Sequence, residues 1–335
     1  MTDTSGKTAI ENASDLGDKN DNTQKYDEFD FGEFEKKALA AVAGLYEIPE
    51  GAYNFRINGK AVKRNSTATI EVLSKKNGRG LEIHVKPGTK NQSVHIPVVI
   101  SYSGLEEVVE NDFYIGEGAD VALIAGCGIY NCGGQDSIHN GVHRLFVGRG
   151  AKVRYLEKHY GFGQGSGAKI LNPTTEVWQK ERSEVIMELE QLKGVTSTNR
   201  VTKAEVGEDA KLVIREKLLT HGRQFANSEI EAILVGKNSS VDIVSRAVAQ
   251  DLSEQKFSSK IVGKNNCRGH SECDAIIMDQ AKVVAIPSLD AESVEAELIH
   301  EAAIGKIAGE QIVKLMSLGL TRQEAESQIV NGFLS

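Results

Sequence analysis

A short motif that recurs along the chain limits its fold more than any other feature. The string FYIGEGADVAL begins at Phe113 and returns as LFVGRGAKVRYL from Leu145, AEVGEDAKLVI from Ala204 and ILVGKNSSVDIV from Ile233. Each copy places a β-branched residue before a glycine, then polar residues, a small residue and the start of an apolar strand. A strand–turn–strand unit of this kind can bury its apolar face only by stacking on copies of itself.

The spacing of the repeat glycines supports this interpretation. These glycines are Gly116, Gly148, Gly207, Gly236 and Gly263. The last three follow one another at intervals of 27 to 29 residues, and the gap from 148 to 207 is about two such units. At the midpoint of that gap, KERSEVIME repeats the pattern with Lys180 in the glycine position. Because a β-sandwich has many short strands but no fixed repeat period, we predict a β-helix, the β-solenoid fold.

The other predicted segments lie before and after this core in the sequence. The expected fold class is mainly β. Residues 1–30 are small and polar without hydrophobic periodicity, which predicts a disordered tail. Residues 31–95 predict a small N-terminal α/β region of one helix and short alternating strands. The β-helix core is expected over residues 96–290, and a C-terminal helical subdomain over residues 291–335.

Helix signals stand near both ends of this arrangement. The segment FGEFEKKALAAVAGL (31–45) is amphipathic and closes on a glycine. A second helix is expected from about Ile304, and a third from Thr321, where Glu324 completes a capping box. The last two helices have the general spacing of a DNA-binding helix–turn–helix, but Arg322 is the only basic residue at the start of the last one. A docking surface for a protein partner is therefore the stronger interpretation.

Composition and charge disfavour several classes of partner. The chain has 39 Lys and Arg residues against 47 Asp and Glu residues, a formal net charge of −8. Surfaces that coat nucleic-acid phosphates or anionic membranes need an excess of basic residues. No stretch approaches the ~20 apolar residues that span a bilayer, and the first residues lack the apolar core of a signal peptide. We therefore expect a cytoplasmic protein that binds neither nucleic acid nor membrane.

Four cysteines fall in two close pairs. They are Cys127 with Cys132 and Cys267 with Cys273. In a long cytosolic chain such pairs are more often thiols or metal ligands than disulfides, although each cysteine could equally be a small buried side chain. The second pair stands in CRGHSECDAI, which also holds His270, Glu272 and Asp274, and His300 and Glu301 follow. Thiolate, imidazole and carboxylate are ligands of iron and zinc, but this spacing matches no standard motif, and a polar turn is the alternative.

The first cysteine pair resembles a zinc finger only superficially. Cys127, Cys132, His139 and His143 follow the patterns C-x4-C and H-x3-H. Only six residues separate Cys132 from His139, about half of the separation in a ββα finger. The segment also has the pattern of strands, whereas the histidines of a finger lie on a helix. A zinc-binding transcription factor is therefore a distant alternative.

Motifs of standard enzymes are absent from the sequence. The chain has no Walker lysine motif, no nucleophile elbow and no H-E-x-x-H. The glycines of GFGQGSG (161–167) have no βαβ context and predict a flexible loop. We therefore expect a protein that is not an enzyme and has no ATPase activity of its own.

Three segments carry a resemblance to a known family. They are VALIAGCG…HNGVHRLFVGRGAKVRYLEKHYG, TEVWQKERSEVIMELEQLKG, and the C-terminal segment from Cys273-Asp274 through HEAAIGKIAGEQIVKLMSLGLTRQEAESQIVNGFL. Together they resemble the SufB/SufD family of iron–sulfur cluster assembly scaffolds, from about Ile96 to the end of the chain. The chain is more similar to a B-type member than to a D-type member because it has both Cys273 and Glu301.

The resemblance implies a fold, partners and ligands. It implies a β-helix core that pairs with a second copy or a sister subunit, and C-terminal helices that dock a SufC-type ATPase. A sulfur donor and apo client proteins are the other implied partners. By motif, Cys273 and Glu301 would be ligands of an iron–sulfur cluster, of which [4Fe–4S] is one candidate type, with the adjacent His300 participating. A mixed ligand set holds a cluster less tightly than four thiolates, which suits a cluster that is handed on.

The chain also departs from the longer B-type subunits. It is shorter in the N-terminal region, and it has no cysteine near Val177 and Trp178, where those subunits place a sulfur-accepting cysteine. Cys127 is the candidate for that role. The alternative function is that of a structural, D-type subunit that holds no cluster of its own. The sequence leaves open the choice between homodimer and heterodimer, any flavin involvement, and the roles of Cys132 and Cys267.

Overall fold

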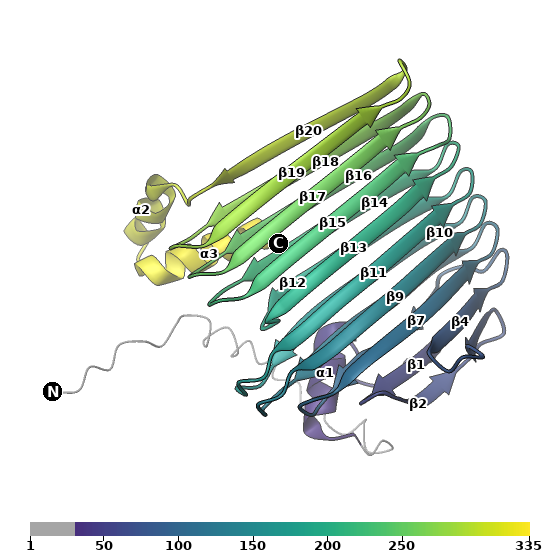
Figure 1. The fold of residues 1–335 in the computed structure, drawn as a ribbon, viewed down its shortest axis with the longest axis horizontal. Helices are drawn as coiled ribbons and strands as arrows, with labels where there is room; N and C mark the ends of the chain where they lie inside the picture. Colours follow the sequence, from purple (N-terminus) through teal and green to yellow (C-terminus); the bar gives the residue numbers. More distant parts are fainter. Residues whose placement is uncertain (1–30) are drawn as a thin grey trace.

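The structure is a computed structural model that describes residues 31–335. Along most of it, two β-sheets lie face to face (Figure 1). From β7 onward, consecutive strands alternate between the sheets, so each strand pairs in parallel with the strand two positions later. This connectivity is a β-solenoid, and the fold predicted from the glycine repeat is confirmed. The tail predicted for residues 1–30 lies outside the described residues.

Sheet A follows the order β2-β1-β5-β8-β10-β12-β14-β16-β18-β20, with β6 pairing β1 and β8. Its strands are β1 (Ala52–Ile57), β2 (Lys60–Asn65), β5 (Gln92–His95), β6 (Val98–Ile100), β8 (Asp120–Tyr130), β10 (Lys152–Phe162), β12 (Glu184–Lys193), β14 (Lys211–Thr220), β16 (Ser239–Ala249), β18 (Cys267–Ile277) and β20 (Ala296–Gly305). Sheet B follows the order β19-β17-β15-β13-β11-β9-β7-β4-β3. Its strands are β3 (Ile70–Ser74), β4 (Gly80–Val85), β7 (Glu106–Ile115), β9 (Ser137–Val147), β11 (Lys169–Gln179), β13 (Ser197–Val206), β15 (Phe225–Leu234), β17 (Glu254–Gly263) and β19 (Lys282–Ala291).

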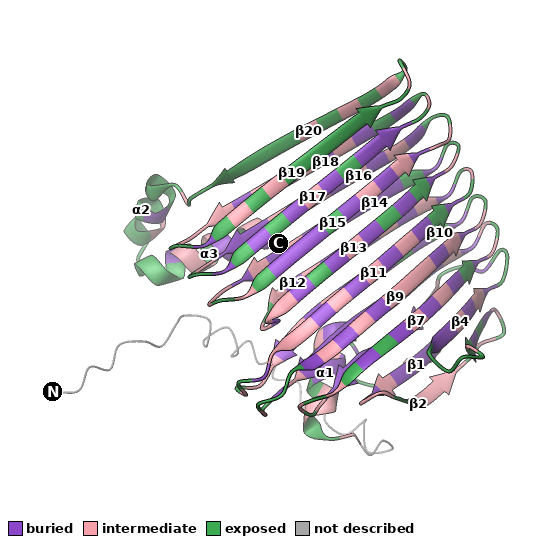
Figure 2. Cartoon of the chain, in the orientation of Figure 1, coloured by how far each residue is buried: buried purple, intermediate pink, exposed green. Residues whose placement is uncertain are grey.

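Adjacent turns of the solenoid stack in register. Strand β14 pairs with β16 over ten consecutive positions, and β16 pairs with β18 over eleven. Side chains alternate between the two faces of a strand, and Figure 2 shows the resulting alternation of buried and less buried residues. A residue and its in-register partners therefore point the same way, so columns of side chains run along the interior and the exterior. Apolar interior columns hold large buried side chains such as Phe113, Leu145 and Met187.

The repeat glycines stand where the corners of adjacent turns come closest. A Cβ on Gly148 would lie 2.7 Å from the carbonyl oxygen of Ile115, and a Cβ on Gly236 would lie 2.0 Å from the backbone nitrogen of Glu208. These neighbours are backbone atoms, which cannot move aside cheaply. Two residues after Gly148, Gly150 adopts a left-handed backbone (φ 61°) that closes the turn. The repeat motif therefore encodes a tight corner.

The glycine-rich stretch 161–167, predicted to be a flexible loop, forms another packed corner. A Cβ on Gly165 would lie 2.4 Å from the carbonyl oxygen of Gly133, and a Cβ on Gly167 would lie 2.1 Å from that of Gln135. Glycine is required here because two backbones approach closely, a reason that the sequence alone did not reveal.

The N-terminal helix α1 (Glu33–Ala43) ends at Gly44, whose φ of 64° is left-handed, as its sequence predicts. Its buried residues include Leu39 and Val42, and the helix lies on β8 and β10. Gly126 of β8 makes this approach feasible, since a Cβ there would lie 2.2 Å from the carbonyl oxygen of Val42. The strands before residue 96 join sheets A and B, so the predicted N-terminal region is continuous with the solenoid.

The solenoid extends further toward the C-terminus than predicted. Strand β20 (Ala296–Gly305) occupies residues assigned to the helical subdomain, so no helix starts near Ile304. Pairing of β20 with β18 over ten positions overrides the helix propensity of its Ala, Glu and Leu residues. The helix begins at Gly309 instead, as α2 (Gly309–Ser317).

Helix α3 (Arg322–Leu334) begins as predicted after Thr321, and both hydrogen bonds of the capping box with Glu324 are present. Its Val330 and Leu334 pack with Val248 against the outer face of sheet A. Within residues 31–335, no helix is long and apolar enough to cross a lipid bilayer.

Candidate functional site

Cys273 and His300 lie on the same face of neighbouring strands at the end of the solenoid. Cys273 is on β18, and His300 is on β20, the last strand of sheet A. The register pairs Cys273 with Ala302 and His300 with Ser271, so both side chains belong to the interior face and are offset by one interior position. The structure thus places the predicted thiol and imidazole ligands as neighbours.

The two side chains differ in their surroundings. Burial raises the pKa of the Cys273 thiol to about 12, and the Glu216 and Asp274 carboxylates add to the increase. The thiol is therefore protonated at neutral pH, and a metal ion must displace a proton to bind it. His300 is half-buried, and its Nδ1 is a buried atom without a hydrogen-bond partner in the described part of the chain. Buried polar atoms are rarely left unpaired, so this nitrogen is free for a ligand.

Glu301 lies on the opposite face of β20. It follows His300 directly, and successive residues of a strand point to opposite faces. Its side chain is 67% exposed, it is in register with Glu272, and its Oε2 lies 4.0 Å from His270 Nε2. The structure therefore does not bring Glu301 to Cys273 within one chain, and their joint ligation of a cluster stays a prediction.

One outer group of donor side chains has spacing suited to a metal ion among residues 31–335. It consists of His270, Glu272 and Glu301, whose ligand atoms all lie within 4.8 Å of one another. The Nδ1 of His270 also lies 2.8 Å from Asp242 Oδ1. Burial raises the pKa of Glu272, and a hydrogen bond with Asp274 contributes to the increase.

Cys127 lies in the interior but at a different level of the solenoid from Cys273. It is on β8, and four strands of sheet A stand between β8 and β18. Burial raises the pKa of the Cys127 thiol well above its usual value, and nearby carboxylates add to the increase. The thiol lines a small cavity of about 20 Å³. The other polar side chains around that cavity include His139, His143, Glu157 and His159. Cys127 and Cys273 therefore do not form one site.

A connected set of buried polar side chains runs along the interior between the levels of these two cysteines. We call it the interior polar chain; it comprises the half-buried His143 and the buried Tyr155, Glu157, His159, Arg200, Glu216, Ser228 and Ser245. At its centre, Glu157 accepts a hydrogen bond from the Tyr155 hydroxyl at 2.9 Å. Its carboxylate also lies 2.7 Å from His159 Nε2 and 3.3 Å from Arg200 Nη1.

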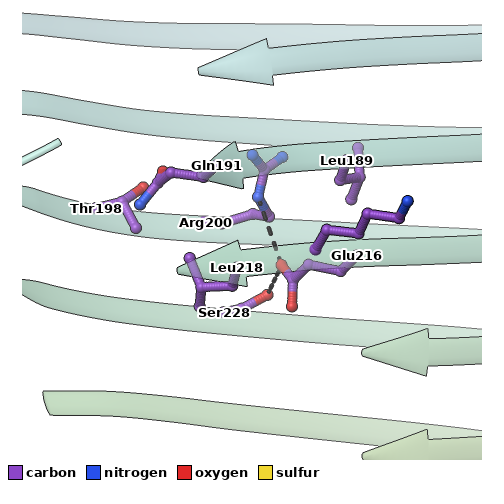
Figure 3. A pocket seen from close by; sticks show the side chains of 8 residues that line it. Leu189, Gln191, Thr198, Arg200, Glu216, Leu218 and Ser228 are labelled. Atoms are coloured by element: carbon purple, nitrogen blue, oxygen red, sulfur yellow. Dashed lines mark hydrogen bonds and ion pairs between the residues drawn. The ribbon is translucent and has the colours of Figure 1, made fainter. Parts of the chain in front are cut away.

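The interior polar chain continues from Arg200 toward Cys273. Arg200 Nε lies 3.7 Å from Glu216 Oε1, and Glu216 accepts hydrogen bonds from Ser228 at 2.7 Å and Ser245 at 2.9 Å. Figure 3 shows Arg200, Glu216 and Ser228 converging around an interior cavity of about 10 Å³. Ser245 is in register with Cys273 on the next strand of sheet A, so the interior polar chain ends beside the Cys273 thiol.

The charge states within the interior polar chain follow from burial and from neighbouring charges. Burial alone would raise the pKa of Glu157, but Arg200 and His159 outweigh burial and hold the pKa well below its ordinary value. Burial lowers the pKa of His143 to about 4 in spite of the nearby Glu157, so this imidazole is neutral at physiological pH. The interior therefore holds an ionised Glu157 that depends on Arg200.

The sequence analysis missed the interior polar chain, although a signal for it is present. In the strand that begins at Lys152, Tyr155, Glu157 and His159 occupy the same alternate positions as Val153, which faces the core. Charged residues in phase with an apolar face predict a polar interior rather than a solvated surface.

The remaining cysteines have unrelated surroundings. Cys132 is exposed, and its hydrogen bond with Tyr130 is the main cause of a lowered pKa. Cys267 is buried in the apolar core at the start of β18. The exposed Cys132 is not grouped with His139 and His143, which line the interior, so the zinc-finger alternative finds no geometric support.

Comparison with known proteins identifies the family that this chain matches and several similar relatives. The family described as "SUF system FeS cluster assembly, SufBD core domain" matches residues 108–333. An iron–sulfur cluster assembly SufBD family protein of Methanothermobacter thermautotrophicus strain Winter is 29% identical over 263 residues, which cover 76% of this chain and 62% of the relative. The chain thus spans less than two thirds of that relative. Family proteins of Archaeoglobus fulgidus (29% identity, 82% of this chain and 73% of the relative) and Methanocaldococcus jannaschii (28% identity, 76% and 80%) are also similar.

The dependence of Glu157 on Arg200 predicts a pH-sensitive loss of stability. Arg200→Met should lower the free energy of unfolding by about 3–5 kcal/mol at neutral pH, because it leaves a buried carboxylate without its cation. The loss should shrink as pH falls and Glu157 takes up a proton. In the wild type, the depressed pKa of Glu157 contributes stability above its unfolded value of 4.5, and this stability is lost as pH falls through the folded pKa.

Urea unfolding from neutral pH to about pH 3 measures both trends. Lys203→Met, which removes an exposed cation from the same strand, is the control and should change stability by less than about 0.5 kcal/mol. A loss at Arg200→Met that is equal at all pH values would contradict the assignment of Glu157 as the dependent group.

The four thiols should differ widely in reactivity. Iodoacetamide at neutral pH should modify Cys132 first, because that thiol is exposed and its pKa is lowered, while Cys127, Cys267 and Cys273 are buried. Peptide mass spectrometry over time gives the order, and Cys132→Ser should remove the fast phase. Equally fast modification of Cys273 in the folded protein would show that solvent reaches the interior face at this turn.

Proposed function

We propose that this chain, which belongs to the SufBD core family of SUF-system iron–sulfur cluster assembly proteins, is a B-type scaffold on which a cluster is built and then released. The cluster is the cargo of such a protein rather than a resident cofactor. Cys273 and His300 are the ligands that this chain contributes from its interior face. The cluster type stays open, with [4Fe–4S] one candidate.

The observation that carries the proposal is the unpartnered Nδ1 of His300 on the same face as the Cys273 thiol. A purely structural turn would gain stability by pairing that nitrogen, because an unsatisfied buried polar atom costs about 1–3 kcal/mol. Imidazole and thiolate are both iron ligands, and two ligands from one chain leave coordination positions for another subunit.

The end of the solenoid offers a surface for that second subunit. Strands β19 and β20 are the last strands of their sheets, and each has one paired edge within the described chain. Exposed apolar side chains lie on them, among them Ile286, Leu289 and Ile299. Unpaired apolar edges of this kind are usually covered in a native assembly. A second copy or a sister subunit seated here would add ligands beside His300.

The C-terminal helices supply a second docking surface, for a SufC-type ATPase. Val313 is 65% exposed on α2, and Leu318 directly after it is 76% exposed. Helix α3 is anchored to sheet A through Val330 and Leu334, which pack with Val248 of β16. Since β16 is the neighbour of β18, movement of a docked ATPase would reach the strand that carries Cys273.

Sulfur delivery is the remaining step, and Cys127 is the proposed acceptor. Its thiol lines a histidine-lined cavity in the same interior that contains Cys273. A sulfur donor and apo client proteins complete the set of partners. A D-type structural role is the alternative, and the high pKa of Cys273 and the distance of Glu301 from the interior favour it.

Anaerobic reconstitution with Fe²⁺ and sulfide tests the ligand assignment. Wild-type protein should gain visible charge-transfer absorption and bound iron, and Cys273→Ser and His300→Ala should lose most of both, because each removes an iron ligand. Cys267→Ser is the matched control, since Cys267 is also buried on the interior face of β18, and it should retain the cluster. A wild type that stays colourless would support the structural alternative.

Substitutions on the proposed docking surface should impair ATPase binding without lowering thermal stability. A Val313→Glu, Leu318→Glu variant should lose most of its affinity for a SufC-type ATPase in calorimetric titration while keeping its thermal stability, because both side chains are exposed. Gln311→Glu, an exposed change on the same helix, should bind normally. Unchanged ATPase binding by the double variant would place the docking surface elsewhere.

A further inference from the structure

A polar cavity lies between the two sheets at the N-terminal end of the solenoid. Its lining residues come from β1 and β2 of sheet A and from β3, β4 and β7 of sheet B (Figure 1). It shares Ile96 and Val98 with the cavity of Cys127, but its other lining residues are different. Its volume is about 430 Å³, which lies within the range of protein pockets that hold small molecules.

The lining of this cavity is positively charged. Arg56, Lys60 and Arg64 line it, and no acidic side chain of the described residues does. The charge of Arg56 is balanced, because its Nε lies 2.7 Å from Glu107 Oε2. Neither Lys60 nor Arg64 pairs with a carboxylate within residues 31–335. Two uncompensated cations therefore face one cavity in a chain whose net charge is −8.

Neutral groups hold the guanidinium of Arg64 in place. Its Nε donates to Asn54 Oδ1 at 2.9 Å, and its Nη1 donates to Ser74 Oγ at 2.9 Å. Asn54 is buried and stands opposite Arg64 in the pairing of β1 with β2. Burial lowers the pKa of Arg64, because a less polar environment disfavours the charged form. A partly desolvated cation without a counter-charge is costly, and an anion in the cavity would relieve that cost.

The hairpin that carries Arg64 and Lys60 is fixed at its turn. Asn58 and Gly59 form a two-residue turn in which both φ angles are positive, 49° and 79°, as in type I′ hairpins. The Asn58 side chain donates to Ser101 Oγ at 2.8 Å and accepts from the Ser101 backbone nitrogen at 2.7 Å. Lys60 follows this turn directly, so the cations are held before any ligand binds.

We propose that this cavity binds a small oxyanion, the phosphate or carboxylate group of a low-molecular-weight ligand, through Arg64 and Lys60. A guanidinium binds such groups through paired N–H bonds, and an ammonium adds a point charge. Arg64 Nη2 and Asn54 Nδ2 form no hydrogen bond within the described chain, so both remain as donors for the ligand. The proposal is independent of cluster assembly, because neither Cys273 nor His300 lines this cavity.

Calorimetric titration of the full chain at low ionic strength tests the proposal, with inorganic phosphate and succinate as separate probes. Wild-type protein should bind one ion of at least one probe with a dissociation constant of about 1 mM or tighter. Arg64→Gln should weaken that binding at least tenfold, because it removes the guanidinium, and Lys60→Gln should weaken it several-fold. Tighter binding of phosphate would assign a phosphate-bearing ligand, and tighter binding of succinate would assign a carboxylate-bearing one.

Asn54→Asp separates loss of binding from loss of folding. It places a carboxylate at the position that already accepts a hydrogen bond from Arg64 Nε, so the guanidinium gains a counter-charge within the chain. The variant should bind the probe at least tenfold more weakly than wild type while its thermal unfolding midpoint stays equal or rises, because a charge-assisted hydrogen bond replaces a neutral one. Wild-type affinity in Asn54→Asp would overturn the proposal.

Lys76→Gln is the matched control. Lys76 is an exposed cation two residues after Ser74, and it does not line the cavity. The variant should bind the probe within about twofold of wild type, since a distant exposed charge is largely screened. Weakening by Lys76→Gln equal to that by Arg64→Gln would overturn the proposal, because it would indicate a diffuse positive surface. A wild type that binds neither phosphate nor succinate would overturn it as well.

Discussion

Register between stacked strands is the constraint on which the rest of this structure depends. Side chains alternate along every strand, and in-register pairing carries each position to the same face of the next turn. Ser245, Cys273 and Ala302 therefore form one interior column, whereas Glu272 and Glu301 form an exterior one. A slip of one residue between β18 and β20 would exchange the faces of His300 and Glu301. The separation of thiol chemistry from carboxylate chemistry thus follows from the same pairing that stabilises the fold.

The interior polar chain is the part of this solenoid whose stability depends on paired charges. Removing an ion such as Glu157 or Arg200 from water costs several kcal/mol, and at Glu157 the charge of Arg200 and the hydrogen bonds of His159 and Tyr155 offset that cost. Apolar columns beside the chain supply the burial that holds the two sheets together. Replacing buried ion pairs by well-packed apolar residues is often neutral or stabilising, so the hydrophobic effect does not account for the polar chain. Under the proposed function, the two thiols Cys127 and Cys273 share this interior.

Local signals in the sequence predicted much of the fold, whereas the faces on which the site residues lie depend on the register between strands. Tight corners leave a local signature, the repeat glycines, and the capping box at Thr321 is local as well. The start of α2 was misplaced because pairing between β20 and β18 is not local and outweighs helix propensity. Cys273, Glu301 and His300 were predicted as cluster ligands from a family motif, and a motif does not show that β20 sends the adjacent His300 and Glu301 to opposite faces. The inner and outer groups become visible only once the strands are in register.

Diffraction from iron-loaded, reconstituted crystals, recorded at the iron absorption edge, tests this partition most directly. The account predicts one position of anomalous density in each chain. It lies on the interior side of β18 and β20, bonded to Cys273 and His300. A single position bonded to both Cys273 and Glu301 of one chain would contradict the account, since the register of β18 and β20 would then have to change.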